Sequence, residues 1–136
     1  MKNIFVYGTL LEGFHNHKAF IEGKYIAKKK GYVNGLLYHL PQGYPALIEG
    51  NGKVYGEIYL IEDENVIKRL DMLEGYKGQD NPCNLYDKII TKVYTQNEEF
   101  DCIAYIYSDK EYAMTDGLLI KDGDWNSFML SGKNKK

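Results

Sequence analysis

Residues 62–75 read EDENVIKRLDMLEG and are the clearest helical segment of the 136-residue chain. Apolar side chains recur at helical spacing and form one stripe, which consists of Val66, Ile67, Leu70 and Leu73. Acidic residues at positions 62–64 suit the positive end of the helix dipole. Gly75 stands where a glycine commonly ends a helix. The segment therefore predicts one amphipathic helix over residues 63–74, with a glycine cap after it.

Strand-like segments lie on both sides of this helix. They alternate or run apolar, and they are rich in Tyr, Val, Ile and Leu. The expected strands cover residues 4–7, 25–40 with a bend at a glycine, 46–49, 54–61, 85–94 and 100–107. Asn51-Gly52 and residues 96–99 predict hairpin turns, and residues 16–22 and 125–130 predict short helices. Because βαβ alternation is missing, we expect an α+β fold with a small, mixed, mostly antiparallel β-barrel.

The size and charge of the chain limit its class. A length of 136 residues fits one domain, expected over residues 1–130, with a flexible polar tail at 131–136. The formal net charge of -2 argues against a dedicated nucleic-acid binder, even with the basic run Lys28–Lys30. Apolar runs are too short for a membrane span, and no signal-peptide pattern opens the sequence. We therefore expect a cytoplasmic protein that binds no nucleic acid and no membrane, and its oligomeric state stays open.

Glu74 is the residue best placed for acid/base chemistry. It lies in the last turn of the predicted helix, where the negative end of the dipole opposes a carboxylate. Together with burial, this position would raise the pKa of Glu74 and suit it to proton transfer near neutral pH. The alternative is a surface glutamate on a helix that also carries Lys68 and Arg69.

The segment Tyr7-Gly8-Thr9-Leu10 follows the first strand and predicts a binding turn. Successive backbone N–H groups in such a turn can converge on an anion. Gly8 permits close approach of the backbone to a ligand, and Thr9 adds a hydroxyl donor. The alternative is an ordinary turn between a strand and a loop.

Other chemistries find little support in the sequence. His15 and His17 are too few for a metal site, which needs three or four ligands. Cys83 and Cys102 form no CxxC motif and have no obvious activating neighbour. Phosphate-loop, dinucleotide-binding and nucleophile-elbow motifs are missing. We expect no metal and no cofactor.

Taken together, four segments resemble the gamma-glutamylcyclotransferase-like superfamily, which includes AIG2-like and gamma-glutamylamine cyclotransferase proteins. The matching segments are Val6–Leu10 with Gly13 and Asn16-His17, Val54–Tyr59, Leu70–Tyr76, and Tyr86-x-Lys88 with Val93. The loop Gly43–Ala46 also looks like a family loop near the pocket mouth. The resemblance covers roughly residues 3–108, and the segment around Trp125 does not align.

The resemblance implies a fold, a site and a reaction. It implies a small mixed barrel in which Glu74 is the catalytic residue and faces Tyr7, Gly8, Thr9 and Leu10 across a pocket, with Tyr86 as a further substrate-binding residue. The implied substrate is a small gamma-glutamyl amide or amine. Its own alpha-amine attacks the gamma-carbonyl, which releases 5-oxoproline and an amine without any nucleophile from the protein.

Three other interpretations remain open at this stage. The first is a non-catalytic small-molecule binding domain on the same scaffold, because a fold does not fix a function. The second is an enzyme that removes a gamma-glutamyl protecting group from a biosynthetic intermediate. The third is a nucleic-acid module in which tyrosines stack on bases, which the acidic net charge disfavours.

Overall fold

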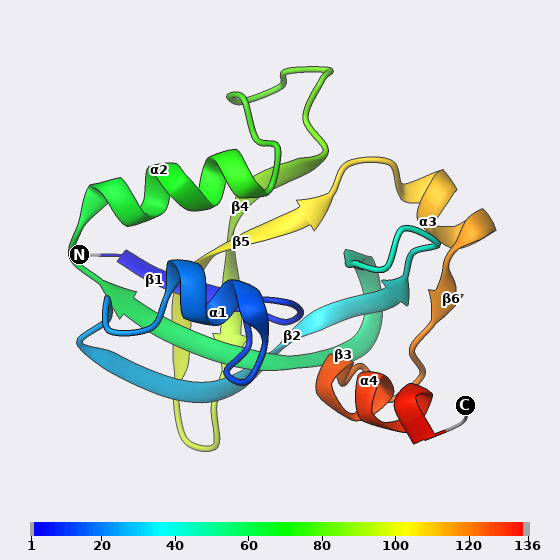
Figure 1. Ribbon diagram of the computed structural model, residues 1–136, viewed down its shortest axis with the longest axis horizontal. Helices are drawn as coiled ribbons and strands as arrows, with labels where there is room; N and C mark the ends of the chain where they lie inside the picture. Colours follow the sequence, from blue (N-terminus) through cyan, green and yellow to red (C-terminus); the bar gives the residue numbers. More distant parts are fainter. Residues whose placement is uncertain (1, 135–136) are drawn as a thin grey trace.

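The computed structural model describes residues 2–134 and contains strands and helices in alternating groups (Figure 1). In chain order the elements are β1 (Lys2–Val6), α1 (His15–Phe20), β2 (Ala27–His39), β3 (Pro45–Ile61), α2 (Glu64–Leu73), β4 (Tyr86–Tyr94), β5 (Glu99–Tyr107), α3 (Lys110–Asp116), β6 (Leu118–Leu119) and α4 (Trp125–Asn134).

The strands close into a barrel. They are hydrogen-bonded in the order β3-β1-β5-β4-β2, and pairing of β2 with β3 completes the ring, while β6 adds to the end of β2. All pairs are antiparallel except β1 with β5, where Ile4 stands opposite Ile103. The predicted α+β class and the small, mixed, mostly antiparallel barrel are confirmed.

The strand β3 differs from the sequence prediction. Instead of two strands joined by a turn at Asn51-Gly52, one strand runs from Pro45 to Ile61 and pairs along most of its length with β2. A β-carbon on Gly52 would lie 2.9 Å from the carbonyl oxygen of Gly35. The glycine therefore permits close approach of two strands and makes no turn there. The predicted bend in the preceding strand does exist, as a register shift between Asn34 and Leu36.

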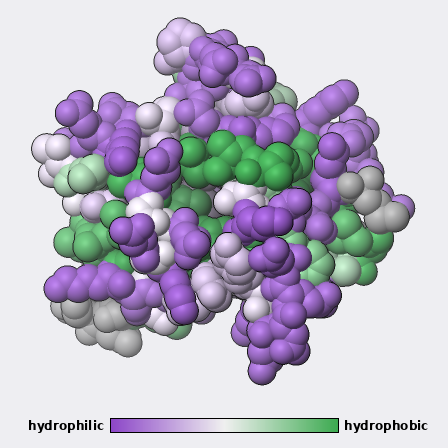
Figure 2. All heavy atoms as spheres, turned by 180° about the vertical axis from the view of Figure 1, so that it is seen from behind, coloured by the Kyte–Doolittle hydropathy of each residue, from purple (hydrophilic) through white to green (hydrophobic). Residues whose placement is uncertain are grey.

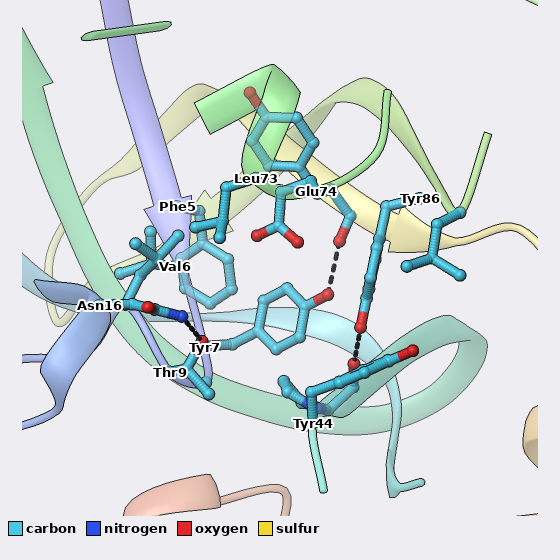
Figure 3. A pocket seen from close by; sticks show the side chains of 14 residues that line it. Phe5, Val6, Tyr7, Thr9, Asn16, Tyr44, Leu73, Glu74 and Tyr86 are labelled. Carbon is cyan, nitrogen blue, oxygen red and sulfur yellow. Dashed lines mark hydrogen bonds between the residues drawn. The ribbon is translucent and has the colours of Figure 1, made fainter. Parts of the chain in front are cut away.

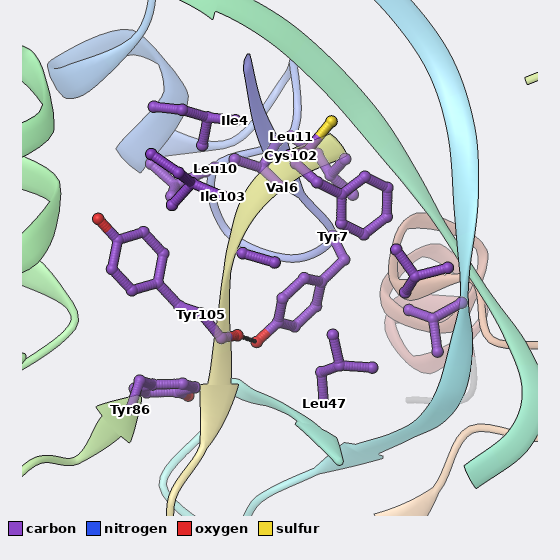
Figure 4. Packing of buried hydrophobic residues seen from close by; sticks show 14 of the residues in the cluster. Ile4, Val6, Tyr7, Leu10, Leu11, Leu47, Tyr86, Cys102, Ile103 and Tyr105 are labelled. Carbon is purple, nitrogen blue, oxygen red and sulfur yellow. Dashed lines mark hydrogen bonds between the residues drawn. The ribbon is translucent and has the colours of Figure 1, made fainter. Parts of the chain in front are cut away.

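Helix α2 lies along the outside of the barrel, beside β1 and β5 (Figure 1). It buries Val66, Ile67 and Leu70, as its apolar stripe predicts. Strand β5, which lies beneath the helix, is buried on both faces. Four consecutive residues of it are each at most 5% exposed, namely Cys102, Ile103, Ala104 and Tyr105. Figure 4 shows Ile103 on the side of β5 toward α2 and Tyr7 on the opposite side. The core thus has a barrel interior and a second layer beneath the helix.

The C-terminal part of the chain packs against the C-terminal end of β2. Trp125 is 1% exposed and stacks on the ring of His39, with 5.4 Å between the ring centroids. Helix α4 has the same length as α2 and continues to Asn134, past the expected domain end at residue 130. Residues 135–136 of the predicted tail lie outside the described residues, and the tail stays a prediction.

The surface carries mostly polar side chains. Seen from behind, hydrophilic residues cover most of the molecule around a hydrophobic band near the middle of that face (Figure 2). Among residues 2–134, the structure contains no helix of the length and apolar character needed to cross a membrane.

Candidate active site

A pocket lies where the end of β1, the end of α2 and the start of β4 meet (Figure 3). Its lining consists of Phe5, Val6, Tyr7, Gly8, Thr9, Leu10, Asn16, Tyr44, Pro45, Leu73, Glu74, Leu85, Tyr86 and Tyr105. All six residues singled out from the sequence, namely Tyr7, Gly8, Thr9, Leu10, Glu74 and Tyr86, are in this set. The structure therefore brings together segments that are nearly 80 positions apart in the chain.

The backbone of Glu74 is held at the end of α2 by a glycine turn. Gly75 adopts a left-handed conformation with φ of 67°. The amide of Gly75 donates to the carbonyl of Met72 at 3.2 Å, and the amide of Tyr76 donates to the carbonyl of Asp71 at 2.9 Å. This pair of bonds is the Schellman motif that terminates many helices. It fixes the direction in which the Glu74 side chain leaves the helix.

The start of β4 holds the same turn from the other side. The amide of Tyr86 donates to the carbonyl of Glu74 at 3.2 Å, and the amide of Leu85 donates to the carbonyl of Gly75 at 3.1 Å. Carbonyl groups at a helix end lack partners within the helix and need others. Because β4 supplies them here, the backbone of Glu74 is tied to the barrel itself.

The Glu74 carboxyl group is desolvated and unpaired. It points into the pocket, toward the ring of Tyr7 (Figure 3). It makes no hydrogen bond or ion pair with any side chain of residues 2–130 or any backbone group of residues 2–134. Burial raises the pKa of Glu74 to about 7. Loss of solvation is the cause of this shift. A carboxyl group with this pKa can both accept and return a proton at neutral pH.

Three buried tyrosines surround Glu74, and each directs its hydroxyl proton to another acceptor. Tyr7 donates to the carbonyl of Tyr105 at 2.5 Å, Tyr105 donates to the carboxylate of Asp71 at 2.5 Å, and Tyr86 donates to the carbonyl of Pro45. Burial raises the pKa of all three phenols, and the negative charge of Glu74 adds to each shift. The tyrosines therefore stay neutral and leave the carboxyl group without a donor.

The loop after β1 forms the opposite wall. Gly8 begins a turn that closes with the amide of Leu11 on its carbonyl at 3.0 Å. A β-carbon on Gly8 would lie 2.2 Å from Cγ of Pro45, so only glycine fits. Within residues 2–134, the amides of Gly8, Thr9 and Leu10 donate to no protein acceptor. These groups are available to a ligand.

Polar contacts from outside the loop keep it in place. The side-chain amide of Asn16 donates to the hydroxyl oxygen of Thr9 at 2.9 Å. Further along, the amide of Glu12 donates to the carboxylate of Glu57 at 3.0 Å, and Tyr59 donates to the same oxygen at 2.7 Å. The Gly56-Glu57-x-Tyr59 part of the strand motif thus supports the loop from β3.

Sequence reasoning missed several pocket residues. The short helix expected from residue 16 begins at His15, and Asn16, named as part of a family motif, turns its side chain to Thr9. Tyr105 and Leu85 carried no motif that would separate them from other strand residues. By contrast, Tyr44 and Pro45 lie in the Gly43–Ala46 loop that was expected near the pocket mouth.

His17 takes a structural position behind the loop. Nδ1 of His17 lies 3.1 Å from the carbonyl oxygen of Leu10, and its ring packs on Tyr59. No group of three or more His, Cys, Asp or Glu side chains that could hold a metal ion exists within residues 2–134.

Comparison with known proteins identifies the family. The family described as gamma-glutamyl cyclotransferase, AIG2-like, matches residues 4–127. A Niallia circulans protein named gamma-L-glutamyl-butirosin B gamma-glutamyl cyclotransferase is 35% identical over 130 residues, which are 96% of this chain and 79% of the relative.

Solved structures agree with this match. A mouse AIG2-like protein superposes with a TM-score of 0.65 at 28% identity, over 82% of each chain. YkqA of Bacillus subtilis superposes with a TM-score of 0.73 at 25% identity, over 99% of this chain, which spans 43% of the YkqA chain. The chain belongs to the gamma-glutamyl cyclotransferase, AIG2-like family.

Proposed function

We propose that this protein cleaves a small gamma-glutamyl amide or amine by cyclisation, with Glu74 as its general base and acid. The observation that carries the proposal is the Glu74 carboxyl group, whose pKa is raised to about 7 by burial and which faces the unbonded amides of Gly8, Thr9 and Leu10 across one pocket. No metal or cofactor takes part in the proposed reaction.

The reaction needs one group that moves a proton twice. Ionised Glu74 accepts a proton from the alpha-ammonium of the substrate, and the freed nitrogen attacks the gamma-carbonyl carbon. A bond forms between that nitrogen and that carbon, and the bond from the same carbon to the leaving nitrogen breaks. Glu74 then gives this proton to the departing nitrogen, and it takes up the second proton, which the ring nitrogen loses as the neutral lactam forms. This second proton passes to the released amine, which leaves as an ammonium ion, and Glu74 is ionised again. A general acid/base of this kind typically contributes about 100- to 10,000-fold to the rate.

The pocket must also hold the substrate in a folded shape. Among the side chains of residues 2–130, no Lys or Arg lines it, so neutral donors are left to bind the alpha-carboxylate. We assign this role to the amides of Gly8, Thr9 and Leu10. Thr9 adds its hydroxyl proton, since its oxygen already accepts from Asn16 and the proton is free to point elsewhere. Holding the amine next to the carbonyl can contribute several kcal/mol, roughly 7 or more in favourable cases.

The leaving group lies on the side of the pocket away from Thr9. Figure 3 shows Asn16 and Thr9 on one side of Glu74, and Tyr44 and Tyr86 on the other. With the alpha-carboxylate at the loop, the gamma-carbonyl would reach Glu74 and the amine would contact these aromatic rings. Tyr86 is therefore proposed as a substrate-binding residue on the leaving-group side.

The test is release of 5-oxoproline, measured by mass spectrometry. Purified protein is incubated with gamma-glutamyl amino acids, gamma-glutamyl-epsilon-lysine, gamma-glutamyl alkylamines and gamma-L-glutamyl-butirosin B. Each substrate is run beside Glu74→Gln and beside Glu64→Gln, which makes the same change at an exposed position of the same helix.

We expect release from at least one class, reduced at least 100-fold by Glu74→Gln and unchanged by Glu64→Gln. Near-normal turnover in Glu74→Gln would refute the role of this residue. If a substrate stabilised the protein against heat without forming product, the alternative of a binding domain on this scaffold would replace the enzyme.

A further inference from the structure

A carboxylate one turn before Glu74, that of Asp71, joins helix α2 to the barrel. Asp71 Oδ1 accepts the hydroxyl proton of Tyr105 at 2.5 Å, and its Oδ2 lies 3.0 Å from Nζ of Lys88. Tyr105 comes from β5 and Lys88 from β4, and the two residues stand opposite each other in the sheet. A single side chain of α2 therefore binds two neighbouring strands.

The apolar contacts of α2 end before the catalytic turn. Leu70 is fully buried, but Met72 is 80% exposed and Leu73 is 36% exposed. The Glu74 carboxyl group has no hydrogen bond of its own to residues 2–134. The side-chain contacts that hold the last turn of α2 against β4 and β5 are therefore mainly those of Asp71.

These contacts continue to the opposite wall of the pocket. The hydroxyl of Tyr105 binds Asp71, while its backbone carbonyl accepts the hydroxyl proton of Tyr7 at 2.5 Å. Figure 4 shows the ring of Tyr105 directed away from Tyr7, toward the side of α2. Tyr105 thus lies between the helix that carries Glu74 and the strand that leads into the loop at Gly8.

We propose that Asp71 is a positioning residue for Glu74, which it keeps aimed into the pocket through its bonds to Tyr105 and Lys88. This inference rests on the proposed function for its catalytic consequence. Its structural part, the fixed and desolvated orientation of the Glu74 side chain, can be measured without substrate.

Charge balance around Asp71 supports this role. Lys88 is the cation that faces it from β4, Tyr105 faces it from β5, and Tyr76 lies under the Lys88 ammonium at 5.4 Å. The ion pair is half-buried, so removing one partner leaves the other charge unbalanced near Glu74. The positive charge of Lys88 balances the negative charge of Asp71, so the pair adds no net charge near Glu74.

Two variants separate the hydrogen bond between Tyr105 and Asp71 from the ion pair between Lys88 and Asp71. Tyr105→Phe removes one hydroxyl and keeps the ion pair, and Asp71→Ala removes both bonds. Asp101→Asn is the matched control, because Asp101 pairs with Lys92 at 3.2 Å on the exposed far part of the same two strands. Lys88→Arg is the conservative variant, since it keeps the positive charge at Asp71.

The first readout is the ¹³C NMR titration of the Glu74 carboxyl carbon in the free protein. The second is kcat and KM for the best substrate. We expect Tyr105→Phe and Asp71→Ala to lower the Glu74 pKa by at least one unit, because the carboxyl group turns toward water. We also expect kcat to fall about tenfold or more with KM changed less than threefold, and Lys88→Arg and Asp101→Asn to behave like the wild type.

An unchanged Glu74 titration and unchanged kcat in both variants would overturn the proposal, even if their melting temperatures fell, because Asp71 would then be only a structural residue. A shifted titration in a protein that releases no 5-oxoproline from any substrate would support the positioning role and refute the proposed function instead. Failure of the positioning role and failure of the proposed function therefore give different results.

Discussion

At the residue scale, the site depends on leaving one carboxyl group without a hydrogen-bond donor. Tyr7, Tyr86 and Tyr105 line the pocket with Glu74, and the hydroxyl of each donates to another oxygen. A donor to the carboxylate would stabilise its ionised form and lower the pKa. Because the donors are engaged elsewhere, burial can raise the pKa of Glu74 to about 7.

The first prediction concerns the pH dependence of activity. The proposed base must be ionised to accept a proton, so kcat/KM should fall about tenfold per pH unit below a midpoint near pH 7. The measurement is kcat/KM from about pH 4 to 9 with a single substrate. A midpoint near the ordinary glutamate value, close to 4.5, would mean that the carboxyl group is solvated.

The second prediction concerns stability. A carboxyl group with a raised folded-state pKa binds more protons in the folded than in the unfolded protein between pH 4.5 and 7. Stability therefore falls as pH rises through this range. Wild type should lose about 3 kcal/mol relative to Glu74→Gln between pH 4.5 and pH 8. Urea unfolding at several pH values measures this difference, and parallel stability curves for the two proteins would contradict it.

At the scale of elements, α2 has two caps with different expected roles. Asp63 accepts the amide proton of Asn65 at 2.9 Å and begins the helix far from the pocket. Gly75 ends the helix next to Glu74, and a β-carbon there would lie 3.0 Å from Cβ of Leu85. Both caps stabilise the same helix, but only the second also fixes the proposed base.

The third prediction compares substitutions at these caps. Asp63→Ala and Gly75→Ala should each cost about 1–2 kcal/mol of stability, through a lost cap and a strained left-handed residue respectively. We expect kcat to stay near normal in Asp63→Ala and to fall at least tenfold in Gly75→Ala. Thermal unfolding and kcat would be measured on both. An equal loss of kcat in the two variants would contradict the special role of the C-terminal cap.

The helix shows which elements the sequence could predict. The apolar stripe, the acidic first turn and Gly75 are local features, so α2 was predictable within one residue at each end. The strand β3 was not, because Asn51-Gly52 is locally a turn signal and only its crowding against β2 makes it part of a strand. Helix α3 and strand β6 were missed for a similar reason, since their short segments gain order from contacts with β2.

At the scale of the whole molecule, the site forms only when the barrel closes. Glu74 and the loop at Gly8 belong to segments far apart in sequence. The loop follows β1, the backbone of Glu74 is bonded to the start of β4, and β5 lies between these two strands in the sheet. Motif order predicted which residues share the pocket. It could not predict Asn16 or Tyr105, whose roles depend on contacts between elements.

The fourth prediction tests whether the C-terminal helix is part of the same fold. Trp125 is fully buried against His39, so Trp125→Ala should cost about 3–5 kcal/mol. Leu130→Ala, at a position that is 55% exposed, is the control and should cost less than about 0.5 kcal/mol. Urea unfolding followed by far-ultraviolet circular dichroism would show the difference. A loss below about 1 kcal/mol for Trp125→Ala would contradict this packing.

The most direct test of the central claim is the reaction in water enriched in oxygen-18. In a cyclisation the nucleophile is the substrate's own amine, so solvent oxygen never enters the glutamyl product. The proposed mechanism predicts 5-oxoproline without oxygen-18 from the wild-type protein and at least 100-fold less from Glu74→Gln. Glutamate that carries one solvent oxygen would show hydrolysis instead, and would contradict the proposed mechanism.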